Sequence, residues 1–468
     1  MSDAAIAAAA PRPGTSAWAA EARATLALGW PIVLTNLAQV AITTTDVAMA
    51  GWLGPQALAA CTLGAHLYFA LLVGGMGLAM ATAPMLAQAR GRCRHAVRDL
   101  RRTVRQGCWL ALAYCLPAWA LLWHGEAVLL ALGQEPALAA AAADYVRTLQ
   151  WGLLPAILFI VQRSFVAALE RPAAAFVVTL LAVGLNAACN WALMFGHWGA
   201  PALGLPGAGI SSTLANGFMV AALGGFLAWD RRFRRYRLTG RWWRADWPRF
   251  RALVRLGLPV SGVFLIEVGV FSAATMLVGL TGAAPLAAHA IALQVASITF
   301  MVPLGVAQAT TVRVGLAAGR GDPGGVARAG WTALALGGGF MAAMAALLVS
   351  VPRALAAPFL DPADPEGAAV AALAVSFITV AAVFQVSDGV QTIGAGALRG
   401  LKDTRVPMLL AGTGYWAIGM PLGVALAFAA GLGALGIWIG LASGLAIVAA
   451  LMLWRWARRE RLGLVAAR

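Results

Sequence analysis

The chain has 468 residues, of which 61% are hydrophobic and only 11% are charged. Soluble domains carry about a quarter charged residues, so this composition excludes an ordinary soluble protein and indicates a polytopic membrane protein. The formal net charge of +16 would suggest nucleic-acid binding in a soluble chain, but the arginines here lie mostly in short loops between apolar runs, where they set membrane orientation. We therefore expect the lipid bilayer, and no nucleic acid, as a partner.

Twelve apolar runs follow one another along the chain, each near the length of about twenty residues that crosses a bilayer as a helix. The sequence thus predicts an all-α membrane protein with spans near residues 28–50, 57–85, 104–123, 149–169, 174–197, 208–229, 254–280, 286–312, 329–350, 369–398, 406–429 and 433–456.

Six of these spans lie in each half of the chain, which predicts two six-helix lobes. The first lobe takes residues 28–229 and the second takes 254–456, with a basic linker at 230–253. Segments 1–27 and 457–468 are expected to be cytoplasmic tails. The linker could be a nucleic-acid or regulatory site, but we interpret it as a cytoplasmic connection, because basic clusters and tryptophans are ordinary membrane anchors.

Basic and non-basic loops alternate between the spans. Arginines gather after every second span, as in the loop 399–405, and in the C-terminal tail, whereas the other loops have no basic excess. The positive-inside rule therefore predicts a multi-pass protein with both termini in the cytoplasm. The longest non-basic loops contain the acidic residues Glu126, Glu135, Asp144, Asp361, Asp364 and Glu366.

The first span carries a carboxylate, Asp46, in otherwise apolar sequence. Asn36, Gln39, Thr43 and Asp46 are spaced three, four and three residues apart, which places them on one stripe of a helix. An acid in a spanning helix is costly unless it faces a cavity or a partner, so it marks an ion or substrate pathway. The alternative interpretation is a structural hydrogen bond or salt bridge between helices.

The stretch around this span recurs later in the chain. A shift of 228 residues (259 − 31) places Pro31 on Pro259 and Gly51 on Gly279, and the match continues to Arg92 on Arg320. Because each half holds an even number of spans, the two repeats have parallel topology. Their pseudo-twofold axis is then expected to run along the membrane normal.

Each lobe has its own acidic site, because the repeat does not copy Asp46 into the second lobe. In the first lobe, Asn186 and Asn190 are four residues apart on one helix face and are the expected partners of Asp46. A carboxylate with amide oxygens suits a hard monovalent cation such as sodium, and a proton on the carboxylate fits equally well.

The second lobe contains Glu267 and Asp388 inside apolar runs. Gln385 and Gln391 flank Asp388 at three residues to either side. We expect these four residues to bind a cation or substrate, with sodium at Asp46 or at Glu267 and Asp388. In both lobes sodium and protons stay open as the coupling ion.

Enzymatic motifs are missing from the sequence. It contains no Walker A sequence, HExxH motif or GxSxG elbow, so we expect no enzyme and no cofactor. The five cysteines form no CxxC pair and are expected to be packing residues, like the two histidines in spans, His66 and His289.

Several segments in order and spacing resemble the multidrug and toxic compound extrusion (MATE) family, over the chain from Leu28 to about Trp456. They are QVAITTTDVAMAGWLGPQALAA, APMLAQARG, RLGLPVSGVFLIEVGVF, PLAAHAIALQ, FMVPLGVAQATTVRVG and GAGALRGLKDTR. Within this family the chain resembles the NorM-like bacterial branch, because it carries Glu267, Asp388 and the amide at Asn190.

The resemblance implies an antiporter of the bacterial inner membrane that exports cationic organic compounds in exchange for inward sodium or protons. It also implies a V-shaped pair of lobes with a central cavity, and we expect the protein to function as a monomer. By position, Asp46, Asn186, Asn190 and Thr213 would form the first cation site. The chain departs from the usual family pattern at Ala290 and Gln294, where a glutamine and an asparagine are common. This departure concerns the detailed contacts with the substrate and not the class of transporter.

Two other functions compete with the antiporter. A lipid-linked oligosaccharide flippase of the same superfamily would be expected to carry a basic cavity for pyrophosphate, whereas the buried charges readable in this sequence are acidic. A channel or receptor without coupling is the second alternative. Duplicated halves with an acid in each favour alternating access over a fixed pore.

Overall fold

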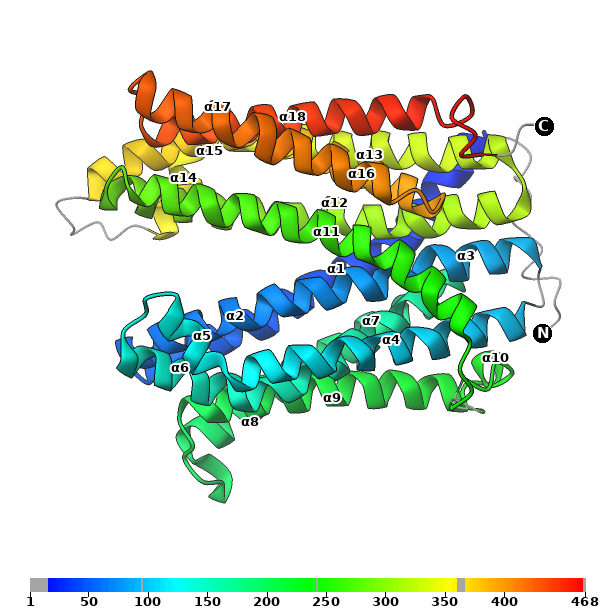
Figure 1. The fold of residues 1–468 in the computed structure, drawn as a ribbon, viewed down its shortest axis with the longest axis horizontal. Helices are drawn as coiled ribbons and strands as arrows, with labels where there is room; N and C mark the ends of the chain where they lie inside the picture. The colour runs from blue at the N-terminus through cyan, green and yellow to red at the C-terminus, as the bar shows by residue number, and fades with distance from the viewer. Residues whose placement is uncertain (1–15, 94–95, 239, 241–242, 360–366, 466–468) are drawn as a thin grey trace. The chain divides into compact units, whose positions relative to one another are not determined.

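The computed structural model describes residues 16–93, 96–238, 240, 243–359 and 367–465. The regular elements of this described part are helices (Figure 1). Twelve of them are long and apolar enough to cross a membrane. The predicted all-α membrane fold and its number of spans are therefore confirmed.

Nine of the twelve spans are single helices, and the other three combine two or more helical segments. In chain order, the helices that form the spans are α1 (Ala17–Trp52), α2 (Pro55–Met80) with α3 (Thr82–Arg92), α4 (Val97–Trp123), α6 (Pro136–Leu149) with α7 (Leu153–Ala168), α8 (Ala173–Phe195), α9 (Leu205–Trp229), α11 (Trp247–Gly279), α12 (Ala283–Arg320), α13 (Pro323–Ser350), α15 (Gly367–Gly400), α16 (Arg405–Gly412) with α17 (Met420–Val424), and α18 (Ala434–Ala457).

Short helices lie in connections that the sequence suggested were loops. They are α5 (Gly125–Ala131), α10 (Arg231–Arg234) and α14 (Pro352–Ala356). Helix α6 also fills most of the connection predicted at 124–148, because its alanine-rich sequence favours helix. The acidic residues Asp361, Asp364 and Glu366 lie outside the described residues.

The chain forms two units. One comprises Leu34–Leu265, and the other comprises Met1–Val33 together with Ile266–Arg468. The unit boundaries fall inside α1 and α11, so each of these helices contributes to both units.

The first half of α1 packs on α12. Arg313 of α12 forms a two-point ion pair with Glu21, with distances of 2.8 Å from Nε to Oε1 and 2.6 Å from Nη2 to Oε2. A Cβ on Gly305 would come within 2.4 Å of the Val33 side chain, so glycine permits this close approach. These contacts explain why α1 begins at Ala17, well before the predicted start of the span at residue 28.

The first half of α11 packs in the other unit, against α2 and α4. The Ser261 hydroxyl donates a hydrogen bond of 2.7 Å to the carbonyl of Gly74. A Cβ on Gly77 would come within 2.4 Å of the Ser261 Cα, so this position also requires glycine. Leu78, Leu110 and Leu253 form a small apolar cluster beside these contacts.

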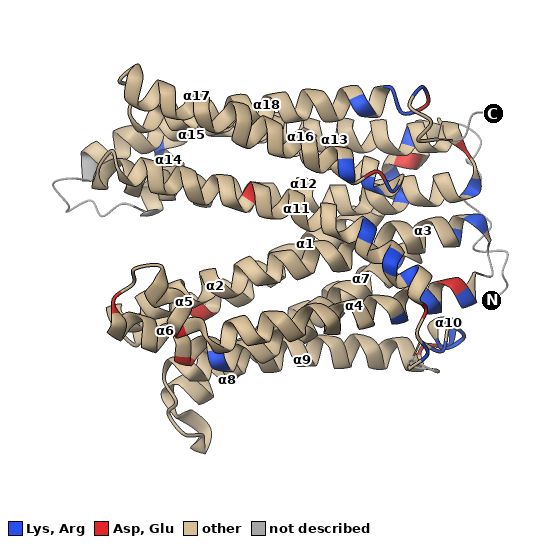
Figure 2. Ribbon diagram, viewed as in Figure 1, with Lys and Arg blue, Asp and Glu red and all other residues tan. Residues whose placement is uncertain are grey.

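Basic residues are distributed unevenly along the helices. Within each unit, the Lys and Arg segments gather mainly at one end of the helices (Figure 2). In the unit of Leu34–Leu265 this end includes Arg90 and Arg92 in the last turn of α3 and the arginines at the start of α4. Such one-sided placement is the pattern that the positive-inside rule describes.

Candidate functional site

Asp46 is held by three hydrogen-bond donors from two neighbouring helices. Its side chain lies in α1 and is only 3% exposed. Oδ1 accepts from the Nδ2 atoms of Asn186 and Asn190 in α8, at 3.0 Å and 2.7 Å, and Oδ2 accepts from the hydroxyl of Ser212 in α9. The structure thus brings together the acid and both asparagines that the sequence predicted as its partners.

The amide oxygens of the two asparagines face no donor. Asn186 and Asn190 are fully buried, and neither Oδ1 atom has a hydrogen-bond partner among the described residues. An asparagine carries donors on its nitrogen and an acceptor on its oxygen, so a half-turn of the amide exchanges one for the other. The site can therefore present N–H groups to an ionised carboxylate or oxygens to a cation or to a protonated carboxyl group.

Ser212, and not Thr213, contacts the acid. The Thr213 hydroxyl donates to the backbone carbonyl of Thr148 at 2.9 Å, so it serves helix packing in this structure. The neighbouring Ser211 hydroxyl bonds to Gly207 of its own helix at 2.9 Å. Three consecutive hydroxyl residues gave no periodic signal to identify the one facing Asp46, and sequence reasoning missed Ser212.

The polar stripe predicted on α1 separates into parts. Asn36 and Gln39 do not approach Asp46 through hydrogen bonds; their side-chain oxygens accept from Nη1 of Arg163 in α7, at 2.9 Å and 3.2 Å. Arg163 is 5% exposed, and Thr43 is exposed. Helical spacing placed the residues on one helix face, but neighbouring helices supply different partners along its length.

A second group of charges lies in the unit that includes Ile266–Arg468. Glu267 comes from α11 and Asp388 from α15, and the charges of Asp388 and Arg399 act on the Glu267 carboxyl group. Asp388 is 5% exposed, and its Oδ1 accepts one long hydrogen bond of 3.4 Å from Gln391. The two acids therefore share one electrostatic environment, and their role as a common site stays a prediction.

Two residues near these acids were not identified from the sequence. Arg399, which the sequence suggested was in a cytoplasmic loop, is buried at the end of α15, 7% exposed. Tyr415 lies in the π-helical segment Thr413–Gly419, where both acids act electrostatically on its hydroxyl. That hydroxyl is buried without a hydrogen-bond partner among the described residues.

The remaining predicted residues take other positions. Gln385 donates to the hydroxyl of Thr299 in α12, so its amide nitrogen is used away from Asp388. Gln391 also donates to Thr392 at 3.2 Å. Ala290 and Gln294 both lie exposed on α12, four residues apart.

Comparison with known proteins places this arrangement in a family. The MatE family model matches residues 31–192 and 259–425, one segment in each half of the chain. A probable multidrug resistance protein NorM from Mesorhizobium japonicum is 57% identical over 445 residues, covering 95% of both chains. The NorM-named protein of Brucella suis is 51% identical over 441 residues, covering 94% of both chains.

Solved structures share the fold at low sequence identity. The eukaryotic MATE transporter AtDTX14 matches with a TM-score of 0.84 at 18% identity, covering 96% of this chain and 100% of that one. A MOP superfamily transporter from Pyrococcus furiosus, for which reverse polarity of the binding pocket suggests a different function, also matches with a TM-score of 0.84, at 19% identity over 96% of this chain and 97% of its own. The family match over both halves and the identity to the NorM-named relatives show that the chain belongs to the MATE transporter family, in its NorM-like bacterial branch.

Proposed function

We propose that the protein is a multidrug efflux antiporter that exports cationic organic compounds in exchange for inward sodium ions or protons. Its relatives with the name probable multidrug resistance protein NorM support the efflux activity. We place it in the bacterial inner membrane with both termini in the cytoplasm, as the alternating basic loops suggest.

The observation that carries this proposal is the set of polar groups around the buried carboxyl group of Asp46. A buried ionised carboxylate at membrane depth is unfavourable, so it is expected to hold either a proton or a metal cation. The unpartnered amide oxygens of Asn186 and Asn190 provide the acceptors that either occupant needs. The site thus has the ligands of a sodium site and the hydrogen-bonding groups of a proton site in one arrangement.

Coupling follows from the change in charge at Asp46. Binding of sodium or a proton adds one positive charge and favours a turn of the two amides, which alters the hydrogen bonds between α1, α8 and α9. A ligand shifts a conformational equilibrium only by its differential affinity for the two states. Export therefore requires the cation and the drug to favour opposite-facing states in an alternating-access cycle.

The electrostatics of the second site suit a cationic substrate. The charges of Asp388 and of one guanidinium group, that of Arg399, both act on Glu267, so two carboxyl groups accompany one cation in this group. In a site of low dielectric, a carboxylate attracts a cationic aromatic compound strongly. We therefore assign drug recognition to these acids and coupling to Asp46.

Transport by the purified protein in vesicles tests this function. Sodium and pH gradients are imposed separately while efflux of a fluorescent aromatic cation is followed. An antiporter accelerates efflux with one of the gradients and stops when that gradient is collapsed. Equal flux with no gradient would instead identify an uncoupled channel.

The flippase alternative is favoured by one feature of the structure. Buried charges in the described residues include cations, since Arg163 and Arg399 are 5% and 7% exposed. Arg163 donates to the neutral amide oxygens of Asn36 and Gln39, so these partners leave its positive charge uncancelled, and that charge would stabilise an anionic group. Translocation of a lipid-linked pyrophosphate in the same vesicles, without efflux of aromatic cations, would support this function over drug export.

A further inference from the structure

A basic cavity lies at the start of α4 and α11, and its lining includes none of Asp46, Glu267 and Asp388. It has a volume of about 770 Å³ and lies within the unit Leu34–Leu265. Its walls come from the first turns of α4, the end of the linker and the first residues of α11. Six arginines line it: Arg98, Arg101, Arg102, Arg105, Arg237 and Arg244.

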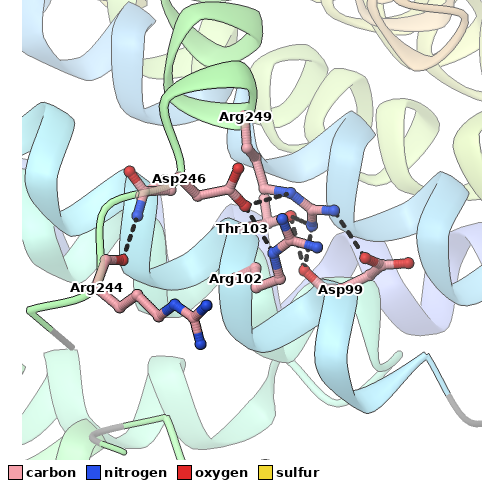
Figure 3. A network of polar contacts seen from close by, with 7 residues as sticks. Asp99, Arg102, Thr103, Arg244, Asp246 and Arg249 are labelled. Atoms are coloured by element: carbon pink, nitrogen blue, oxygen red, sulfur yellow. Dashed lines mark hydrogen bonds and ion pairs between the residues drawn. The ribbon is translucent and has the colours of Figure 1, made fainter. Parts of the chain in front are cut away.

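Ion pairs and hydrogen bonds fix the frame of this cavity (Figure 3). Asp246, directly before α11, accepts from Nε of Arg102 in α4 at 2.6 Å. The guanidinium group of Arg249 donates twice to Asp99: Nη2 donates to the side-chain Oδ1 at 2.7 Å, and Nη1 donates to the backbone carbonyl at 2.6 Å. Gln106 of α4 donates to the Arg244 carbonyl at 3.4 Å. The linker is therefore attached to α4 and forms a wall of defined geometry.

The lining has a large excess of positive charge. Six guanidinium groups face one carboxylate, that of Asp246, which is engaged by Arg102. The side chains of Arg101 and Arg244 form no ion pair with any other described residue. Arg105 is attracted by Asp246 and repelled by Arg101, Arg102 and Arg244. Concentrating like charges around a cavity costs free energy that an anionic ligand would recover.

The cavity lies at a level suited to phospholipid headgroups. Trp247 lines it and is 58% exposed, and the nearby Trp243 is 67% exposed. Tryptophans on the first turn of a spanning helix are typical of the membrane–water interface. By the positive-inside rule, this basic end of the helices faces the cytoplasmic leaflet, where anionic lipids meet basic pockets between spanning helices.

We propose that this cavity binds the phosphate groups of an anionic phospholipid headgroup. Guanidinium groups bind phosphate oxygens through two parallel charge-assisted hydrogen bonds, and several arginines around one cavity suit a headgroup with two phosphates, as in a diphosphatidyl lipid. The proposal goes beyond drug export, since it needs neither the acids of the two sites nor the transport cycle.

Native mass spectrometry of the full chain in detergent tests the proposal. The protein is titrated with cardiolipin, phosphatidylglycerol and zwitterionic phosphatidylcholine, and separately with inorganic pyrophosphate. The test variant is Arg101→Gln/Arg244→Gln, which keeps the Arg102–Asp246 and Arg249–Asp99 ion pairs. The control is Arg231→Gln/Arg232→Gln, which removes the same charge from exposed linker residues outside the cavity lining.

Cardiolipin is expected to bind more tightly than phosphatidylglycerol, and phosphatidylcholine weakly. The test variant should bind cardiolipin roughly 10- to 30-fold more weakly, since each arginine near the surface contributes about a tenfold or smaller factor, and the control should bind like the parent. Equal binding by both double variants would overturn the site. Tight pyrophosphate binding without a preference for cardiolipin over phosphatidylcholine would overturn the assignment to a lipid in favour of a soluble phosphate ligand.

Discussion

The buried carboxyl groups of the Asp46 site and of the Glu267–Asp388 site are surrounded by different kinds of groups. Asp46 is surrounded by neutral donors, because Asn186, Asn190 and Ser212 all donate to its oxygens. Among the described residues, Asp388 accepts one long hydrogen bond from Gln391, and the charge of Arg399 acts on its neighbour Glu267. Asp46 is thus surrounded by neutral hydrogen-bond donors, whereas Glu267 lies in the field of a second acid, Asp388, and of the cation Arg399.

This difference separates two tasks that an antiporter must perform. Neutral amides can exchange donors for acceptors when a small cation arrives, so the Asp46 site responds to the presence of an ion. A cluster of charges responds instead to the charge of a larger ligand, and it does so over a longer distance. We therefore expect mutations at the first site to change ion coupling and mutations at the second site to change drug recognition.

The largest expected effect is that of Asp46→Asn. Asparagine has nearly the same shape as a protonated aspartic acid but cannot take up a cation, so drug binding should persist while efflux driven by an ion gradient is lost. We expect a decrease of at least about 100-fold, the upper range of allosteric coupling. Equilibrium drug binding and gradient-driven efflux, measured on the same preparation, separate the two outcomes.

Asp388→Asn is expected to have the next largest effect, on affinity for the drug and not on ion coupling. Removing one of two carboxyl groups leaves Arg399 closer to charge balance, so affinity for cationic compounds should fall by about tenfold, or 1.4 kcal/mol. The dependence of efflux on the ion gradient should be unchanged, and so should expression. Efflux of anionic compounds at the rate of cationic ones would contradict the electrostatic basis of this site.

Ser212→Ala tests the hydrogen-bonding half of the comparison. It removes one of three donors to Asp46, and because two donors remain, we expect a cost at the low end of the range for a charged group, about 1.5 kcal/mol. The ion concentration for half-maximal efflux should therefore shift by about tenfold. Ser211→Ala is the matched control, since the Ser211 hydroxyl bonds to its own helix. Thr213→Val tests the sequence prediction, and an effect as large as that of Ser212→Ala would restore Thr213 to the site.

Tyr415→Phe is expected to have the smallest effect. Its hydroxyl has no hydrogen-bond partner among the described residues, so efflux should change by less than about twofold and the melting temperature should not fall. Tyr114→Phe is the contrasting variant, because the Tyr114 hydroxyl donates to the Leu71 carbonyl at 2.6 Å and its loss should lower the melting temperature. A large loss of efflux in Tyr415→Phe would show that hydrogen bonds matter at the second site too.

The fold was accessible from the sequence because each span is a long apolar run. What the sequence did not predict are features set by tertiary contacts. Helix α1 starts at Ala17 because Glu21 pairs with Arg313, nearly 300 residues later, and no local pattern reports such a pairing. Arginine in a loop and arginine at a buried helix end also look alike in sequence, which is why Arg399 was misplaced.

The sites were only partly accessible for the same reason. Asp46, Asn186 and Asn190 could be linked because an acid inside a span demands partners and two amides share a helix face. The serine that completes the group depends on the rotation of α9, and the diversion of Asn36 and Gln39 to Arg163 depends on the neighbour α7. Periodicity gives the face of a helix, whereas the identity of its neighbour comes from packing.

Drug-driven movement of the coupling cation tests the central assignment most directly. Vesicles containing the protein receive a drug gradient without any ion gradient, and counterflow of sodium is followed with a radiotracer and that of protons with a pH-sensitive dye. The parent protein is predicted to move one of these cations against the drug, and Asp46→Asn to move neither while still binding drug. Cation counterflow in Asp46→Asn at the parental rate would contradict the account and assign coupling to Glu267 and Asp388.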